Sequence, residues 1–158
     1  MKNFKNKIYI YTGLLIIILS STFFIYNNIK REQKGEEEYF SYINIKAQEY
    51  YDASDYSNSI LLYNKLIKLD SIKGNYYFNR ASCFFKIGKY ELSIKDLNQS
   101  IILKNKMSKS HFNLGLIYML LQKDTLAYTN FSLAYKYNPF DIEAKSQKDF
   151  FEKRIKQK

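Results

Sequence analysis

The chain has 158 residues, room for about one domain, and its 46% hydrophobic and 25% charged residues are typical of a folded protein. The net charge is +10, but six of the 25 basic residues precede Glu36 against one acidic residue there, so much of the excess is terminal. The single cysteine, Cys83, excludes an intrachain disulfide and a cysteine zinc site. We interpret it as a small packed residue.

Residues 8–26 form an uncharged, strongly apolar run that follows Lys2, Lys5 and Lys7. As a helix this run is about 28 Å long, close to the thickness of a bilayer core. It predicts a single transmembrane anchor. A cleaved signal peptide is the alternative, because it also has a basic start and an apolar centre. Against cleavage, the run continues through residues 23–25 and offers no clear Ala-x-Ala site.

The expected orientation places the short basic tail in the cytoplasm and the rest of the chain outside, in the periplasm or the extracellular space. The alternative localisation is secretion after signal cleavage. Residues 27–39 are then expected to be a charged linker, with the run Glu36–Glu38 as the solvated start of a helix.

Residues 108–141 carry the clearest pattern in the chain. Leu114, Gly115 and Tyr118 recur at helical spacing, and Ala127, Phe131 and Ala134 do so again after a short polar break. Asp124 is expected to cap the second of these helices, and Asn138–Pro139 to end it. The pattern predicts two antiparallel helices joined by a tight turn.

These residues resemble the tetratricopeptide repeat (TPR), a helix-turn-helix unit of 34 residues. Seven of eight signature positions match, and the exception is His111, where the family usually has an aromatic residue. We interpret His111 as a packing residue. Two further windows, 40–73 and 74–107, precede this one without gaps and keep the same order of small and large residues.

The second window, 74–107, contains Gly88 as the turn residue between its helices. Arg80 and Asp96 occupy positions where they are expected to pair between the two helices, with a structural role. After the third window, Asp141 is a good N-cap for a helix over 142–158 that caps the array and ends in a basic tail. The expected fold is therefore all-α: an N-terminal transmembrane helix (1–26), a linker (27–39), three TPR repeats (40–141) and a capping helix.

No catalytic constellation is present. The glycines are isolated, the only histidine leaves no His pair for zinc, and paired carboxylates are absent from the repeat interiors. We expect no enzyme activity, no cofactor and no metal. A nucleic-acid partner is not expected either, because the aromatic residues sit at core spacing and the basic excess of the repeats is modest.

The resemblance implies that the first helix of each repeat lines a concave groove that binds a peptide or a partner helix. The predicted protein-binding residues are Asn44, Gln48, Tyr51, Asn75, Phe78, Asn79, Phe85, Lys86, Lys109, Phe112, Asn113 and Leu116. The groove positions also include Ser41, Asp52, Ser82, Met119 and Leu120. An alternative is that Phe112, Leu116 and Met119 are covered by the protein itself or by a second copy.

Some three-repeat members of the family clamp a C-terminal carboxylate with Lys, Asn, Asn, Lys and Arg. The matching positions here hold Asn44, Gln48, Asn79, Lys109 and Asn113, so only Asn79 and Lys109 agree. Binding of a chaperone tail is not predicted. The function expected is a membrane-tethered adaptor or scaffold that binds a protein partner. One alternative is a structural protein that associates with itself into a homo-oligomer. The other is a non-catalytic subunit of a larger enzyme or assembly complex.

Overall fold

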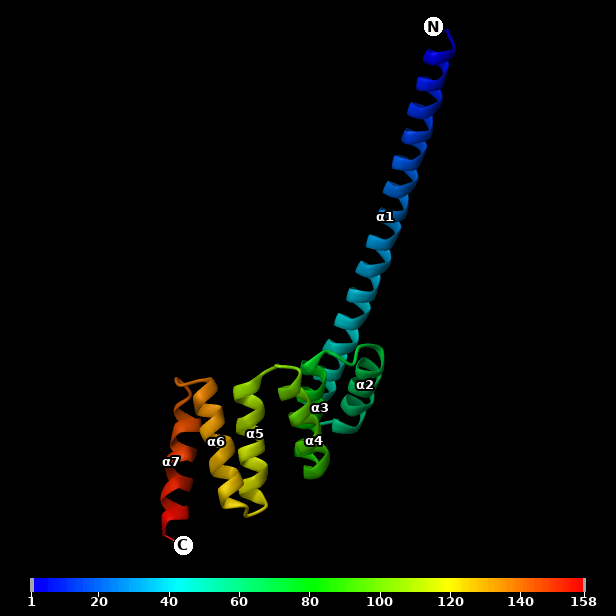
Figure 1. Cartoon of the computed structure of the whole chain (residues 1–158). Helices are drawn as coiled ribbons and strands as arrows, with labels where there is room; N and C mark the ends of the chain where they lie inside the picture. The colour runs from blue at the N-terminus through cyan, green and yellow to red at the C-terminus, as the bar shows by residue number, and fades with distance from the viewer. Residues whose placement is uncertain (1, 158) are drawn as a thin grey trace. The chain divides into compact units, whose positions relative to one another are not determined.

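The computed structural model describes the backbone of residues 2–157 and the side chains of residues 18–157. These residues form helices and no strand, and they divide into two units with the boundary between Tyr42 and Ile43. The helices, labelled in Figure 1, are α1 (Lys2–Asp52), α2 (Tyr56–Leu69), α3 (Gly74–Lys86), α4 (Tyr90–Ile102), α5 (Met107–Leu120), α6 (Asp124–Tyr137) and α7 (Ile142–Lys156).

In the first unit, α1 runs without a break through the expected linker at 27–39. A helix start at Glu36–Glu38 is not observed. The segment contains no proline and is rich in lysine, arginine, glutamate and glutamine, which are good helix formers. Lys34 and Glu38 also form an ion pair at the i, i+4 spacing, 3.7 Å between Nζ and Oε1. The charges therefore continue the helix instead of interrupting it.

The predicted membrane anchor at residues 8–26 is not supported. Within the described residues, no helix contains an apolar stretch long enough to cross a bilayer. Residues 8–17 lie outside the residues whose side chains are described. Because no such helix is found, the expected localisation as a membrane protein with its repeats outside is wrong.

In the second unit, each helix packs against the next one in the chain, from α2 to α7 (Figure 1). The end of α1 joins this stack through Ser59 on α2, whose Oγ donates to the Ala47 carbonyl oxygen at 2.8 Å. One helix pair later, Ser93 donates to the Ala81 carbonyl oxygen at the same distance. The two bonds are equivalent contacts, so α1 with α2 repeats the geometry of α3 with α4.

Small residues set how closely the helices of a pair approach. Ala47 and Ala81 are fully buried, and Gly115 holds the equivalent place on α5. A Cβ on Gly115 would lie 2.7 Å from two ring carbons of Phe131 on α6. The large ring on one helix thus fills the space that the missing side chain leaves on the other, as the sequence pattern predicts.

The polar contacts between helices confirm the two interpretations made for Arg80 and His111. Arg80 Nε and Nη2 donate to the two Asp96 carboxylate oxygens at 2.7 and 2.8 Å, and Asp96 is only 4% exposed. His111 is buried, stacks on Tyr137 and lies 3.1 Å from Asn130 through Nδ1. Each pair joins two neighbouring helices, which is a packing role.

The helix ends confirm one predicted cap and correct another. Asp141 caps α7, since its Oδ1 accepts from the Ala144 backbone N–H at 2.9 Å. Asp124 is not an N-cap: it is the first residue of α6, is buried, and its Oδ2 lies 3.1 Å from Nε of Arg154 on α7. Asp124 therefore ties α6 to α7. As predicted, α6 ends before Asn138–Pro139.

Candidate protein-binding site

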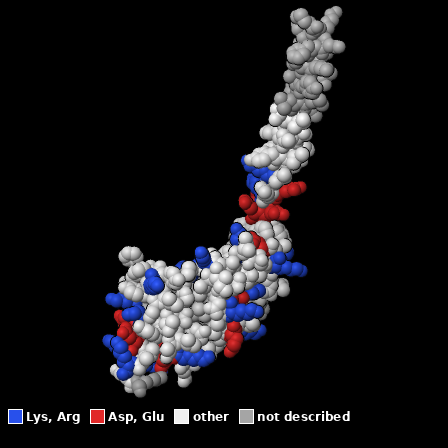
Figure 2. Space-filling view, in the orientation of Figure 1, with Lys and Arg blue, Asp and Glu red and all other residues white. Residues whose placement is uncertain are grey.

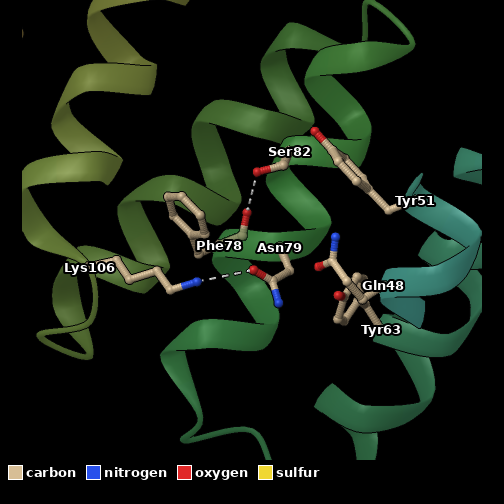
Figure 3. Close-up of a pocket in the computed structure, with 7 residues that line it drawn as sticks. All are labelled: Gln48, Tyr51, Tyr63, Phe78, Asn79, Ser82 and Lys106. Carbon is tan, nitrogen blue, oxygen red and sulfur yellow. Dashed lines mark hydrogen bonds between the residues drawn. The ribbon is translucent and has the colours of Figure 1, made fainter. Parts of the chain in front are cut away.

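A pocket of about 250 Å³ lies between the last turn of α1, the middle of α2 and the body of α3, with one residue from the segment before α5. Figure 3 shows the lining side chains, which are Gln48, Tyr51, Tyr63, Phe78, Asn79, Ser82 and Lys106. In that view Lys106 and Phe78 lie on one side of Asn79, and Gln48 and the two tyrosines lie on the other. The pocket therefore joins a cation and an aromatic ring to a group of hydroxyls and amides.

Lys106 reaches the pocket because the chain turns sharply in front of α5. Its backbone is left-handed, with φ of 43°, and it is the residue preceding the helix. Its Nζ donates to Asn79 Oδ1 at 3.4 Å and lies 4.5 Å from the centre of the Phe78 ring. Burial, and to a lesser degree the neighbouring Lys109, lowers the pKa of Lys106. The ammonium is thus partly removed from water without a charged partner among these contacts.

Tyr63 and Tyr51 provide the hydroxyl groups of the pocket. Burial raises the pKa of Tyr63 to about 12, partly opposed by the nearby Asn79 amide, and burial also raises the pKa of Tyr51. Both phenols are therefore protonated and able to donate at neutral pH. Tyr63 is 1% exposed, and its hydroxyl has no hydrogen-bond partner of good geometry among the described residues.

Four of the predicted binding residues line this pocket: Gln48, Tyr51, Phe78 and Asn79. Six others are not among its lining residues, and these are Asn44, Asn75, Phe85, Lys86, Lys109 and Asn113. The Asn44 side-chain oxygen is buried without a hydrogen-bond partner among the described residues.

Phe112 and Leu116 have a different environment. With Met119 they are half-buried against a cluster formed by Ala127, Phe131 and Phe151, and the Phe112 and Phe131 rings meet edge to face at 5.4 Å. These side chains are thus partly covered by the chain itself, which was the alternative considered for them.

Tyr63 and Lys106 were missing from the predicted site. Tyr63 lies on the second helix of its pair, at a place where the following pairs have Leu97 and Phe131, so its spacing indicates a core residue. Lys106 lies between helices, where the resemblance assigns no contact. The one signal in the sequence was that Tyr63 and Lys106 carry a polar atom at positions where the equivalent residues are apolar.

Metal binding and thiol chemistry have no support among the residues that the structure describes. Among the residues that the structure describes, no group of three histidine, cysteine or acidic side chains could hold a metal ion. Cys83 is fully buried, 3.2 Å from Ser59 Oγ, and burial raises the pKa of its thiol. Figure 2 shows basic and acidic side chains intermixed over the visible face of the helices.

Comparison with known proteins agrees with this fold. The model of the tetratricopeptide repeat family matches residues 74–106. The second unit therefore has the fold of a tetratricopeptide-repeat solenoid, and residues 74–106 match the repeat itself. The first TPR of Spaghetti (RPAP3), solved with the HSP90 peptide SRMEEVD, is similar with a TM-score of 0.68 and 22% identity over 73% of this chain and 92% of that one. The Yersinia enterocolitica type III secretion chaperone SycD, in complex with a peptide of the translocator YopD, has a TM-score of 0.69 and 15% identity, covering 77% and 96% of the chains.

Among curated relatives, human serine/threonine-protein phosphatase 5 is 29% identical over 113 residues, 72% of this chain and 23% of that protein. The Hsp70-Hsp90 organizing protein of Triticum aestivum is 26% identical over 98 residues, 62% of this chain and 17% of that protein. The chain thus spans about a quarter or less of the length of these relatives.

Proposed function

We propose that the second unit is a protein-interaction module that binds an extended peptide or a partner helix along the face formed by α1, α3 and α5, and that it acts as an adaptor. The pocket between α1, α2 and α3 is the observation that carries this proposal. It brings side chains from separate helices around a space that can hold a ligand group. A site assembled in this way from stacked helices suits a ligand that runs across them.

The similar structures support a peptide as the ligand. Two of them were solved with short peptides, from HSP90 and from YopD. For this chain the partner is inferred from the chemistry of the pocket alone. Of the positions that the resemblance carries over for a C-terminal clamp, Lys109 does not line the pocket, and Asn44 and Asn113 replace cations. The proposal therefore does not include a chaperone tail.

We also propose that residues 40–73, 74–107 and 108–141 are the three repeats, with 142–158 as the cap. The equivalent bonds from Ser59 and Ser93 to the preceding helices support the first two divisions. The match of the repeat family to 74–106 supports the second. Self-association through Phe112 and Leu116 has less support, because these side chains pack against the chain's own cluster.

A photo-crosslinking residue placed at Gln48 tests the interaction site in the full chain. Gln48 is an exposed residue that lines the pocket, whereas Leu61 on α2 is 63% exposed and lies outside the pocket lining, so it serves as the matched control. We expect a discrete partner adduct from position 48 that is absent from position 61 and is lost when Phe78→Ala is added. Identical adducts from both positions would contradict the proposal. An adduct with the mass of two copies of the chain would favour self-association instead.

A further inference from the structure

The pocket contains a buried hydroxyl that the fold does not require. Tyr63 is almost fully buried, and its hydroxyl has no hydrogen-bond partner of good geometry among the described residues, although the Asn79 amide is close enough to oppose part of the rise in its pKa. The same place in the next two helix pairs holds Leu97 and Phe131, which are equally buried and carry no polar atom. An apolar side chain is therefore sufficient to pack this position. The Tyr63 hydroxyl adds a buried donor, and leaving such a donor unpaired costs free energy. A ligand that accepts a hydrogen bond would remove that cost.

The cation of the pocket is specific to this repeat as well. The places equivalent to Lys106 hold Ile72 and Phe140, which are 74% and 91% exposed. Lys106 instead folds over Phe78 and donates to Asn79, and neither of these partners is charged. Since burial lowers the pKa of Lys106, its charged form is stabilised by an anion that enters the pocket.

The charge around the pocket is compatible with such an anion. None of the seven lining residues is acidic. Asp52 is the carboxylate at the rim, and its Oδ1 accepts one amide hydrogen of Gln48 at 2.9 Å. Two further donors are the second amide hydrogen of Gln48 and the Nδ2 group of Asn79. The Oδ1 atom of Asn79 already accepts from Lys106. The lining residues thus offer a cation and several hydrogen-bond donors to an anion.

We propose that this pocket receives the carboxylate of an aspartate or glutamate side chain from the bound partner, with Lys106 as the ion-pair partner and Tyr63 as a hydrogen-bond donor. The inference rests on the proposed function and names its ligand group. A side chain fits better than a chain terminus, because the pocket holds one cation and Lys109 is not among its lining residues. Its volume of about 250 Å³ lies below that of sites for larger ligands. One side chain is therefore the expected occupant.

Positional-scanning peptide libraries test the inference with the full-length protein. Each pool is N-acetylated and C-amidated and fixes one residue in a randomised dodecapeptide, so no pool carries a terminal carboxylate. We expect the pools that fix glutamate or aspartate to bind at least about fivefold more strongly than those that fix glutamine or asparagine. The preference should disappear in Lys106→Gln and fall about threefold or more in Tyr63→Phe.

Two controls separate the pocket from general electrostatics. Lys109→Gln removes one positive charge outside the pocket lining and should keep the preference for acidic pools. Asp52→Asn removes the rim carboxylate but keeps an acceptor for Gln48, and it should increase the preference. Tyr63→Phe should unfold at the same temperature as the wild type or higher, so its loss of binding cannot be attributed to misfolding.

The outcomes distinguish this inference from the function on which it rests. Pools that bind with no acidic preference, yet lose binding in Phe78→Ala, would leave the interaction module in place and overturn the acidic subsite. An equal loss of preference in Lys106→Gln and Lys109→Gln would also overturn it. A stronger preference for unamidated pools, or for pools that fix phosphoserine, would assign the pocket to a different anion. Absence of binding by every pool would overturn both proposals.

Discussion

A single residue, Gly115, determines how closely α5 and α6 approach each other. A Cβ at this position would lie 2.7 to 2.9 Å from three carbons of the Phe131 ring, and Phe131 is fully buried. The ring cannot move aside without displacing Phe151, which stacks on it at 5.7 Å between centroids. One hydrogen atom in place of a methyl group thus sets the spacing of three helices.

Gly115→Ala should destabilise the second unit by about 1–3 kcal/mol, because overpacking outweighs the better helix propensity of alanine. Denaturation by urea, followed by circular dichroism, measures this difference. Gly35→Ala is the control, since nothing lies within 4 Å of a Cβ built there. It should be neutral or stabilising by up to about 1 kcal/mol. Equal effects of the two substitutions would show that close packing at Gly115 is not the cause.

Tyr63→Phe should raise the free energy of unfolding by about 1 kcal/mol at neutral pH, because it removes a buried donor without a partner. Burial raises the pKa of Tyr63 to about 12 from its ordinary value of 10.0, so the folded state disfavours the phenolate. The wild type then loses stability as the pH rises from about 10 to about 12. The advantage of the variant should grow there by about 1.4 kcal/mol per pH unit.

Chemical denaturation between pH 7 and pH 11.5 measures this difference. Tyr51 and Tyr76 have raised pKa values too, so both proteins lose stability in alkali, and only the difference between them reports on Tyr63. A constant difference across the pH range would contradict the assignment of the raised pKa to this hydroxyl.

The residues that the sequence predicts correctly are those whose role depends on their position in the repeat. Arg80 with Asp96, and His111 as a packing residue, follow from spacing along two helices. Tyr63 and Lys106 could not be found in that way. Tyr63 has the spacing of a core residue, and its hydroxyl becomes part of a site only because α1, α2 and α3 pack around the pocket. Lys106 reaches Asn79 because its own backbone is left-handed. Glycine is the residue that usually indicates this conformation in a sequence, and a lysine does not.

At the element scale, the turns between the helices of each pair share one backbone feature. Ser54, Gly88 and Gln122 hold equivalent places and all have positive φ, of 61°, 73° and 56°. Only Gly88 was singled out from the sequence. The same turn forms with serine or glutamine because the packing of the two helices enforces the left-handed conformation on residues that disfavour it.

Gln122→Gly should therefore stabilise the protein by about 0.5–1 kcal/mol. Relief of the left-handed conformation, worth about 1–2 kcal/mol, exceeds the greater entropy that glycine has in the unfolded chain. The reverse change, Gly88→Ala, should destabilise by about 1 kcal/mol, and a Cβ there would meet no atom within 4 Å. The midpoint of thermal unfolding measures both. A lower midpoint for Gln122→Gly would show that the glutamine side chain contributes more than its backbone costs.

Helix boundaries show where prediction by element fails. Asp141 has the expected capping bond, but Asp124 instead pairs with Arg154, a residue thirty places away in the basic tail of the predicted capping helix. A local pattern cannot report a partner on another helix. The charged linker expected at residues 27–39 is itself helical, because its charged residues are good helix formers.

At the scale of the whole second unit, stability depends on contacts between neighbouring helices. In a stacked array each helix pair contacts only its neighbours, so an end pair has one side less covered. Here α7 supplies that cover: Phe151 is 1% exposed and packs with Ala127 and Phe131, and Arg154 pairs with the buried Asp124. Phe112 and Leu116 on α5 pack against the same cluster. The last helix is thus connected to two others.

Phe151→Ala should destabilise the second unit by about 3–5 kcal/mol, because it opens a cavity beside Phe131 and uncovers the cluster that holds α5 to α6. Phe150 is the matched control. It is the adjacent phenylalanine on the same helix and 54% exposed, so Phe150→Ala should cost about 1 kcal/mol or less. If α7 is energetically part of the array, urea unfolding of Phe151→Ala stays a single transition with an unchanged slope at a lower midpoint. If instead α7 detaches first, an early transition appears and the slope of the main one falls, since the remaining helices bury less surface. The first result would make α7 a structural part of the repeat array, and the second would make it an independent element that the array can release.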